Sequence, residues 1–319
     1  MAETPDFSKA IKRTIFIAFL AAALYVGLTF WAGYSSMVNA ISTFPVSYLF
    51  FATGLVTLNY VIRYARWDFL LYSNNIRIPH KQNFLIFLSG FALTMTPAKI
   101  GEAIKSVLLA KKGIPITDSI GAVIYERIND LIAVSILAAS GIIFLGQGIL
   151  ATLVSFIVIT AGILILSNDT ATSVAMGVLK KLHVPETVLA RILEIIENTR
   201  VYLPLKIQLP SLMAGITGWF FEGAAFFIIC QGLNIDISLH VAVFIFAIST
   251  IAGIFFPGGL GGMEGMLLLL LKEHGNWGQI ITSVILIRFV TVWWATFCGF
   301  ISLSIYAFWS HTPHKNVEK

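Results

Sequence analysis

Residues 280–308 read IITSVILIRFVTVWWATFCGFISLSIYAF, an apolar run in which Arg288 is the one charged side chain. About 20 such residues cross the hydrocarbon core of a bilayer as a helix. Lipid offers no partners to backbone N–H and C=O groups, so a spanning segment must close these hydrogen bonds within its own helix. Further apolar runs occupy residues 14–34, 44–62, 131–145, 149–167 and 211–231. The sequence therefore predicts an all-α, polytopic integral membrane protein.

The composition supports this fold class. Of the 319 residues, 57% are hydrophobic and 12% are charged, whereas about 25% of the residues of a typical soluble domain are charged. The mean hydropathy is +0.87. The short alternating segments of a membrane β-barrel are absent. We therefore expect residues 1–319 to form a single transmembrane domain.

Several function classes are excluded at this level. The net charge is +5, but most basic residues lie beside helix ends, where inner-leaflet placement and anionic lipids account for them, so no nucleic-acid partner is expected. The six histidines lack the spacing of metal ligands, and no phosphate-binding glycine motif follows a strand. No cofactor or metal is expected, and this chain alone is not an ATP-driven pump.

The basic residues also predict an orientation. Lys9, Lys12 and Arg13 precede the run 14–34, which is too long for a secretory signal and is interpreted as a retained first helix. Lys and Arg are frequent in residues 63–81, at Lys111-Lys112 and in residues 168–209. They are absent from residues 35–43, 146–148 and 232–239, which leaves only Lys272 for the outer side. The positive-inside rule then predicts a multi-pass protein of the cell membrane with a cytoplasmic N-terminus. It also places residues 170–205, with the amphipathic stretch 185–203, on the cytoplasmic face.

Two apolar segments stop too early to be whole spans. Residues 83–96 end at Pro97, and residues 240–256 end at Pro257. We expect two broken, re-entrant hairpins, one over 83–112 entered from the cytoplasm and one over 240–275 entered from outside. Broken helices are tolerated at membrane depth where protein or a water-filled cavity covers them. The residues expected to form the breaks are Pro97, Gly101, Pro257, Gly258, Gly259, Gly261 and Gly262.

The two hairpins resemble each other. After the first proline come Glu102 and then Arg127, at an interval of 127 − 102 = 25, and after the second come Glu264 and Arg288, at 288 − 264 = 24. The pattern of helix, broken hairpin and helix predicts two inverted repeats, about 44–145 and 210–308. Paired interrupted segments in inverted halves are typical of transporters with a site near the midplane. Chance is the alternative, because Pro, Gly and Glu are common at helix breaks.

Ionisable residues within these spans are the candidate substrate-binding groups, since each costs at least about 2.5–3.5 kcal/mol to insert. Arg127 and Asp130, three residues apart, are expected to pair, and Glu126 to meet Lys99 or Lys105. Thr96 is expected to cap a helix that starts near Pro97, with its positive end toward an anionic head group. The candidates are Lys99, Glu102, Lys105, Glu126, Arg127, Asp130, Glu222, Glu264 and Arg288.

The alternative role for such charges is to lock helices together or to reach the membrane interface. For Arg63, Arg66, Lys111 and Lys112 we prefer this alternative. For Glu102, Arg127, Glu264 and Arg288, which occur in both halves, we prefer a role in a cavity.

Four motifs together resemble a known family. They are Arg66-Trp67, the stretch TPAKIGEAIK at 96–105, ERIND at 126–130, and PGGLGGME at 257–264. The chain is similar over residues 14–308 to the flippase-like transmembrane family, whose best-known members are the membrane region of lysylphosphatidylglycerol synthases. Gly262-Met263 departs from the bulkier pattern usual after the glycines, and the 319 residues hold no counterpart of the soluble aminoacyl-transfer domain.

The resemblance implies lipid translocation between leaflets rather than lysyl transfer. The expected substrate is an anionic or zwitterionic phospholipid, a glycolipid or a polyprenyl-phosphate lipid. In this hypothesis Arg127 and Arg288 hold the phosphate, while Glu102 and Glu264 neutralise them and are candidates to carry coupling protons. Two alternatives stay open: a membrane-embedded lipid-modifying transferase with a carboxylate base, and a non-catalytic membrane partner of a separate glycosyltransferase or synthase.

Overall fold

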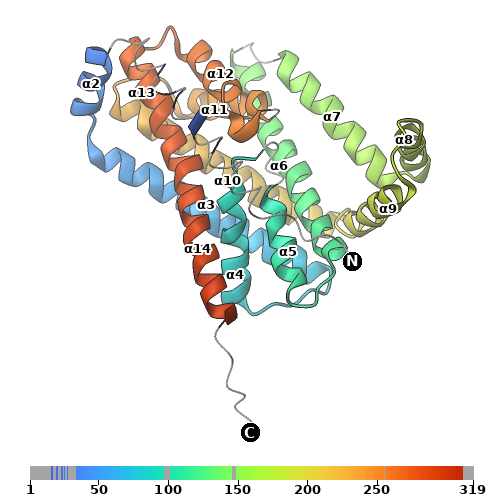
Figure 1. The fold of residues 1–319 in the computed structure, drawn as a ribbon. Helices are drawn as coiled ribbons and strands as arrows, with labels where there is room; N and C mark the ends of the chain where they lie inside the picture. Colours follow the sequence, from blue (N-terminus) through green and yellow to red (C-terminus); the bar gives the residue numbers. More distant parts are fainter. Residues whose placement is uncertain are drawn as a thin grey trace.

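A computed structural model describes residues 34–96, 101–145, 149–254 and 256–311, together with Phe16, Phe19, Leu20, Ala23, Tyr25 and Gly27. The described residues form helices and no strand, which confirms the all-α prediction (Figure 1). The α-helices are α2 Tyr34–Thr43, α3 Val46–Ser73, α4 His80–Ser89, α5 Ile104–Ala110, α6 Ile116–Leu145, α7 Ile149–Ser167, α8 Asp169–Lys181, α9 Glu186–Arg200, α10 Leu205–Gly232, α11 Leu239–Gly253, α12 Gly262–Leu271, α13 Trp277–Arg288 and α14 Trp294–His311.

Three described helices are long and apolar enough to cross a membrane: Val46–Ser73, Leu205–Gly232 and Trp277–Trp309. The last combines α13 and α14, which are joined by a π-helical turn at Phe289–Trp293. Helix α6 is 30 residues long and carries charged residues in its middle. The multi-pass membrane architecture is therefore confirmed, although α3 extends well beyond residue 62, where the apolar run ends. The predicted first span, 14–34, lies mostly outside the described residues.

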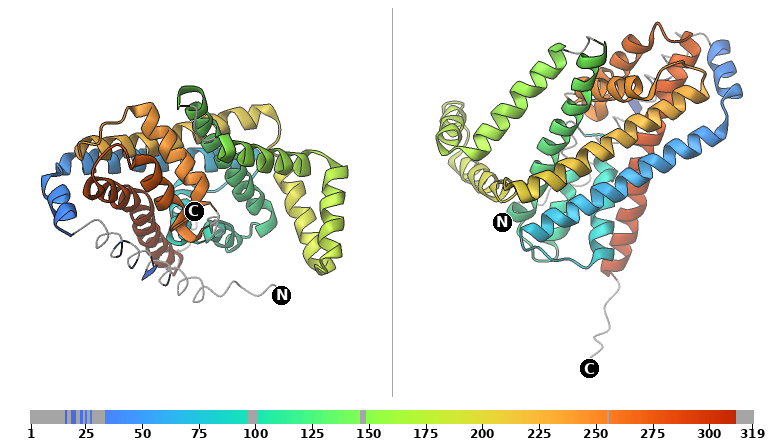
Figure 2. Two further views of the ribbon diagram at one scale, coloured as in Figure 1. Left: turned by 90° about the horizontal axis from the view of Figure 1, so that it is seen from above. Right: turned by 180° about the vertical axis from the view of Figure 1, so that it is seen from behind.

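Helices α3 and α10 pack against each other along one face of the fold. They run antiparallel and lie side by side, as the blue and yellow helices of Figure 2 (right) show. Glycines on α10 permit this approach: a Cβ placed on Gly218 would lie 2.3 Å from Oδ1 of Asn59, and one on Gly215 would lie 3.0 Å from Nη1 of Arg66. The polar face of α3 is thereby packed against a helix that leaves room for it.

Each half contains an interrupted unit. In the first, α4 continues into a 3-10 turn at Gly90–Leu93 and the chain returns through α5; in the second, α11 is followed by a 3-10 turn at Pro257–Gly259 and α12. The α5–α6 loop lies at one end of the molecule and the α12–α13 loop at the other (Figure 1). The two breaks meet, because a Cβ placed on Gly258 would lie 3.5 Å from Cα of Met95. The relation of the two units by an inverted repeat stays a prediction.

The first break differs in detail from the expectation. Residues 101–103 form a 3-10 turn and α5 begins at Ile104, so the α-helix begins later than Pro97 indicates. Pro97 and Lys99 lie outside the described residues. The hydroxyl of Thr96 accepts a hydrogen bond of 2.7 Å from the Gly101 N–H at the start of this 3-10 turn, and the helix start that Thr96 is expected to cap lies outside the described residues.

The segment 170–205 forms the peripheral helices α8 and α9 (Figure 1). The chain bends by 105° between Phe156–Ser167 and Asp169–Lys181. At this bend the Asn168 side chain caps α8 by accepting from the Thr170 and Ala171 N–H groups. Arg200 links α9 to this bend. Its Nε donates a hydrogen bond of 2.8 Å to the Leu166 carbonyl, and its Nη1 lies 2.7 Å from Oδ1 of Asp169.

Candidate functional site: a cavity lined by arginines

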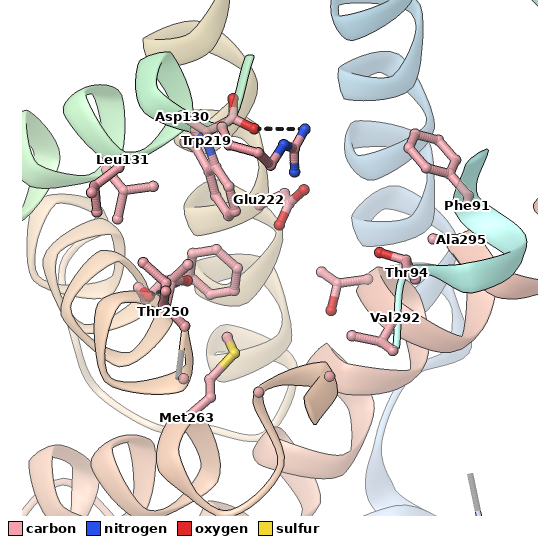
Figure 3. Close-up of a pocket in the computed structure, with 18 of the residues that line it drawn as sticks. Phe91, Thr94, Asp130, Leu131, Trp219, Glu222, Thr250, Met263, Val292 and Ala295 are labelled. Carbon is pink, nitrogen blue, oxygen red and sulfur yellow. Dashed lines mark hydrogen bonds and ion pairs between the residues drawn. The ribbon is translucent and has the colours of Figure 1, made fainter. Parts of the chain in front are cut away.

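A cavity of about 310 Å³ lies where residues from both halves of the chain meet. Five charged side chains line it, three basic and two acidic, namely Arg63 of α3, Arg127 and Asp130 of α6, Glu222 of α10 and Arg288 of α13. In Figure 3, Trp219, Glu222 and Thr250 lie on the side of the cavity opposite Phe91 and Thr94.

Most of the remaining wall is apolar. It includes the aromatic residues Tyr60, Phe91, Trp219 and Phe246, and two glycines of the second break, Gly258 and Gly259. A mainly apolar cavity with a few convergent polar groups is the usual form of a ligand site.

In the first half, Glu102 lies between two arginines. Its Oε2 atom is 3.5 Å from Nη2 of Arg63 and 3.4 Å from Nη2 of Arg127. Thr94 donates a hydrogen bond of 3.3 Å to the other carboxylate oxygen of Glu102. Asp130 contacts Arg127 at 3.1 Å, as its i, i+3 spacing predicts, and Arg66 at 2.7 Å. The charges of α3, α6 and the first break therefore compensate one another.

A second layer lies behind this wall. Nζ of Lys105 is 2.6 Å from Oε2 of Glu126 and 4.0 Å from the centre of the Trp67 ring. The pairing of Glu126 with Lys105 is one of the two that the sequence left open. Glu102, Lys105 and Glu126 support the wall without lining the cavity. Glu102 contacts two lining arginines, whereas Glu126 pairs with Lys105 and with Arg66, which lies behind the wall as well.

All three lining arginines keep hydrogen-bonding capacity. Nε and Nη2 of both Arg63 and Arg127, and Nε of Arg288, have no hydrogen-bond partner among the described residues. Buried donors are normally satisfied, and an exception needs an explanation such as a ligand. A phosphate oxygen is a suitable acceptor for a guanidinium group.

The second half has its own ion pair. Oε1 of Glu264 lies 2.9 Å from Nε of Arg288, while Oε2 accepts a 2.8 Å hydrogen bond from the Gly261 N–H and so caps α12. Arg288 also donates to the Gly258 carbonyl and to Sδ of Met263. The hydroxyl of Tyr25, in the N-terminal segment, donates to Glu264. Arg288 lines the cavity, and Glu264 lies behind it.

The backbone conformation of the second break explains why glycines occur there. Gly258, Gly259 and Gly261 have φ angles of +60°, +77° and +83°, a left-handed conformation that costs other residues energy. This backbone turns the Gly258 carbonyl toward Arg288. Pro257 opens the 3-10 turn and Gly262 begins α12.

The two halves thus repeat one arrangement. A glutamate of each break pairs with an arginine of the following helix, at 3.4 Å for Glu102 and Arg127 and at 2.9 Å for Glu264 and Arg288. Both arginines reach the same cavity. Glu222 also lines it and accepts a 2.7 Å hydrogen bond from the amide of Asn59.

The preferred role for Arg63 and Arg66 is to lock helices together or to reach the interface, and their ion pairs from α3 to Asp130 of α6 fit the first of these. Both are buried and ion-paired, and Arg63 lines the cavity. A signal was present: Asn59, Arg63 and Arg66 follow at i, i+4 and i+7 and form one polar stripe on a mostly apolar helix. Lys111 and Lys112 are exposed, which fits a position at the interface.

Comparison with known proteins identifies a relative and a family. A UPF0104 membrane protein of Methanocaldococcus jannaschii is 27% identical over 218 residues, which are 63% of this chain and 88% of the relative. A family model described as the lysylphosphatidylglycerol synthase TM region matches residues 15–299, a range that includes both interrupted units and every cavity-lining arginine. The chain therefore belongs to the family of the lysylphosphatidylglycerol synthase transmembrane region.

Proposed function

We propose that this protein moves a lipid with a negatively charged phosphate group between the leaflets of the membrane. The observation that carries the proposal is the cavity between two interrupted helical units, with arginines from three helices on its wall. Phospholipids, phosphate-linked glycolipids and polyprenyl-phosphate lipids all have the required group.

The arrangement of arginines and carboxylates around the cavity supports reversible binding of the lipid phosphate. An isolated buried arginine is costly, and Glu102, Asp130 and Glu264 compensate for Arg63, Arg127 and Arg288. The donors of Arg63 and Arg127 that lack a hydrogen-bond partner among the described residues can form charge-assisted hydrogen bonds to a phosphate without breaking an existing hydrogen bond. The same carboxylates then keep the site stable after the lipid has left.

The cell membrane, with the N-terminus on the cytoplasmic side, is the location that we propose from the distribution of Lys and Arg. A separate glycosyltransferase or synthase as partner is a further proposal, which rests on the resemblance alone.

The test uses the full chain, purified and reconstituted in proteoliposomes that contain phosphatidylglycerol with a fluorophore on one acyl chain. Addition of a membrane-impermeant quencher should extinguish the fluorescence of both leaflets with protein, and of the outer leaflet alone in protein-free vesicles. Mass spectrometry of the recovered lipid separates the alternatives. An unchanged mass with translocation supports the proposal, a changed mass indicates a transferase, and an unchanged mass without translocation indicates a non-catalytic partner.

A further inference from the structure

The cavity is small for the lipid that it is proposed to serve. Its volume of about 310 Å³ lies at the lower limit of pockets for drug-sized ligands, roughly 300–1,000 Å³. Two acyl chains and a head group do not fit in this space together. Part of the lipid must therefore stay outside during binding.

The chemistry of the wall indicates which part enters. Arg63, Arg127 and Arg288 can bind a phosphate, and the carboxylates of Asp130 and Glu222 can accept hydrogen bonds from hydroxyl or ammonium groups attached to it. Acyl chains offer no partner for these groups. The head group is thus the part that matches the wall.

The wall also reaches the molecular surface. Phe256 lines the cavity and is nevertheless 47% exposed, and the adjacent Pro257 is exposed as well. Both residues belong to the second break. Exposed apolar side chains in a membrane protein are compatible with lipid, so chains attached to a bound head group can leave the cavity here.

We infer that only the head group enters this cavity while the acyl chains remain in the bilayer, so that the substrate is a phosphodiester lipid with a small head group and not one that carries an oligosaccharide. This inference rests on the proposed function. It adds a size limit, set by side chains that enclose the head group.

Trp219 is the side chain that best tests the limit. It lies on the wall one helical turn before Glu222 (Figure 3), and its ring centre is 6.5 Å from that of Phe246. Replacing the indole by a methyl group enlarges the cavity beside the carboxylate that would meet the head group. Trp219→Phe keeps an aromatic ring next to Phe246 and serves as the milder variant.

The experiment compares two lipids in the proteoliposome assay. Both are phosphatidylglycerol with the same labelled acyl chains, and one carries a trisaccharide on its terminal hydroxyl. We expect the unmodified protein to move the trisaccharide lipid at least about tenfold more slowly, as steric exclusion from a fitted pocket predicts. Trp219→Ala should reduce this ratio, Trp219→Phe should reduce it less, and Trp309→Ala, on an exposed side chain outside the cavity wall, should leave it unchanged.

A second series varies the acyl chains. Short and long chains on the same head group should move at similar rates, because the chains do not enter the cavity. Equal rates for the two head groups in the unmodified protein would overturn the inference and leave the proposed function intact. Absence of translocation for every lipid would overturn the proposed function, and the inference with it.

Discussion

The Oε2 atom of Glu102 is shared between Arg63 and Arg127, at 3.5 and 3.4 Å. A carboxylate oxygen can accept from two donors, but neither contact is a hydrogen bond here, and Nε and Nη2 of both arginines have no hydrogen-bond partner among the described residues. The shared carboxylate therefore stabilises the buried cations while leaving part of their binding capacity for a ligand.

Arg63→Gln should slow translocation of phosphatidylglycerol by about tenfold or more. Hydrogen bonds to a charged group contribute roughly 1.5–3 kcal/mol, and 1.36 kcal/mol corresponds to a factor of ten in rate. Arg77→Gln is the matched control, since Arg77 is exposed and lies over the ring of Tyr72 away from the cavity. Equal rates for the two variants at equal protein content in the vesicles would remove Arg63 from the site.

Glu102→Gln and Glu264→Gln should each lower the translocation rate and alter its pH profile. Glutamine keeps the size of the side chain and an oxygen for the Gly261 N–H, so α12 retains its cap, while the ionic partner of the arginine is lost. The measurement is the rate at several pH values, together with the amount of folded protein by size-exclusion chromatography. Parental rates and pH profiles in both variants would assign these carboxylates a purely structural role.

At this scale the sequence predicts pairs that are local or strongly patterned, such as Arg127 with Asp130. It does not give the partners of Arg63 and Arg66, because the apolar run 44–62 ends at the first charge whereas the helix α3 continues to Ser73. The partners of Arg63 are Glu102 and Asp130, which are distant in sequence. The partner of a buried charge often lies on another helix, so it is known only once the packing of the helices is known.

Among the elements, the contact between α3 and α10 depends on small residues. Gly218→Ala should lower the stability of the protein by about 1–3 kcal/mol, the usual cost of overpacking, because the new Cβ would lie 2.3 Å from Oδ1 of Asn59. It should also weaken the hydrogen bond from Asn59 to Glu222 and slow translocation.

The control is Gly177→Ala on α8, where a Cβ meets nothing within 4 Å. Replacement of a helical glycine at such a site stabilises by about 0.4–1 kcal/mol through the unfolded state. Thermal unfolding of both purified variants in the same detergent should thus move in opposite directions. A shift of the same sign and size in the two variants would show that the α3–α10 contact tolerates a methyl group.

The sequence predicts the ends of helices where a proline or a run of glycines interrupts an apolar segment. It does not predict changes of helix type within an apolar segment. The breaks near Pro97 and Pro257 follow from residues that cannot continue a regular helix. The π-helical turn at Phe289–Trp293, by contrast, lies inside a continuous apolar run, and no residue there predicts a change of helix type. It directly follows Arg288, and π-helical turns often occur at functional sites.

For the whole molecule, the testable property is the placement of the two interrupted units. Single cysteines at Lys112 and Lys272 should react with an impermeant maleimide from opposite sides of the membrane, in a background without Cys230 and Cys298. Both lysines are exposed and lie at the ends of the first and second unit. Labelling of both positions from the same side would contradict the inverted arrangement that the charge distribution predicts.

The two breaks meet beside the arginine-lined cavity, because a Cβ placed on Gly258 would lie 3.5 Å from Cα of Met95 and Gly258 itself lines the cavity. Gly258 has a φ of +60°, in a run of glycines whose dihedral angles are only weakly restricted. Neither interrupted unit completes the cavity wall alone. The site therefore exists only in a chain whose two units have both been inserted and have met.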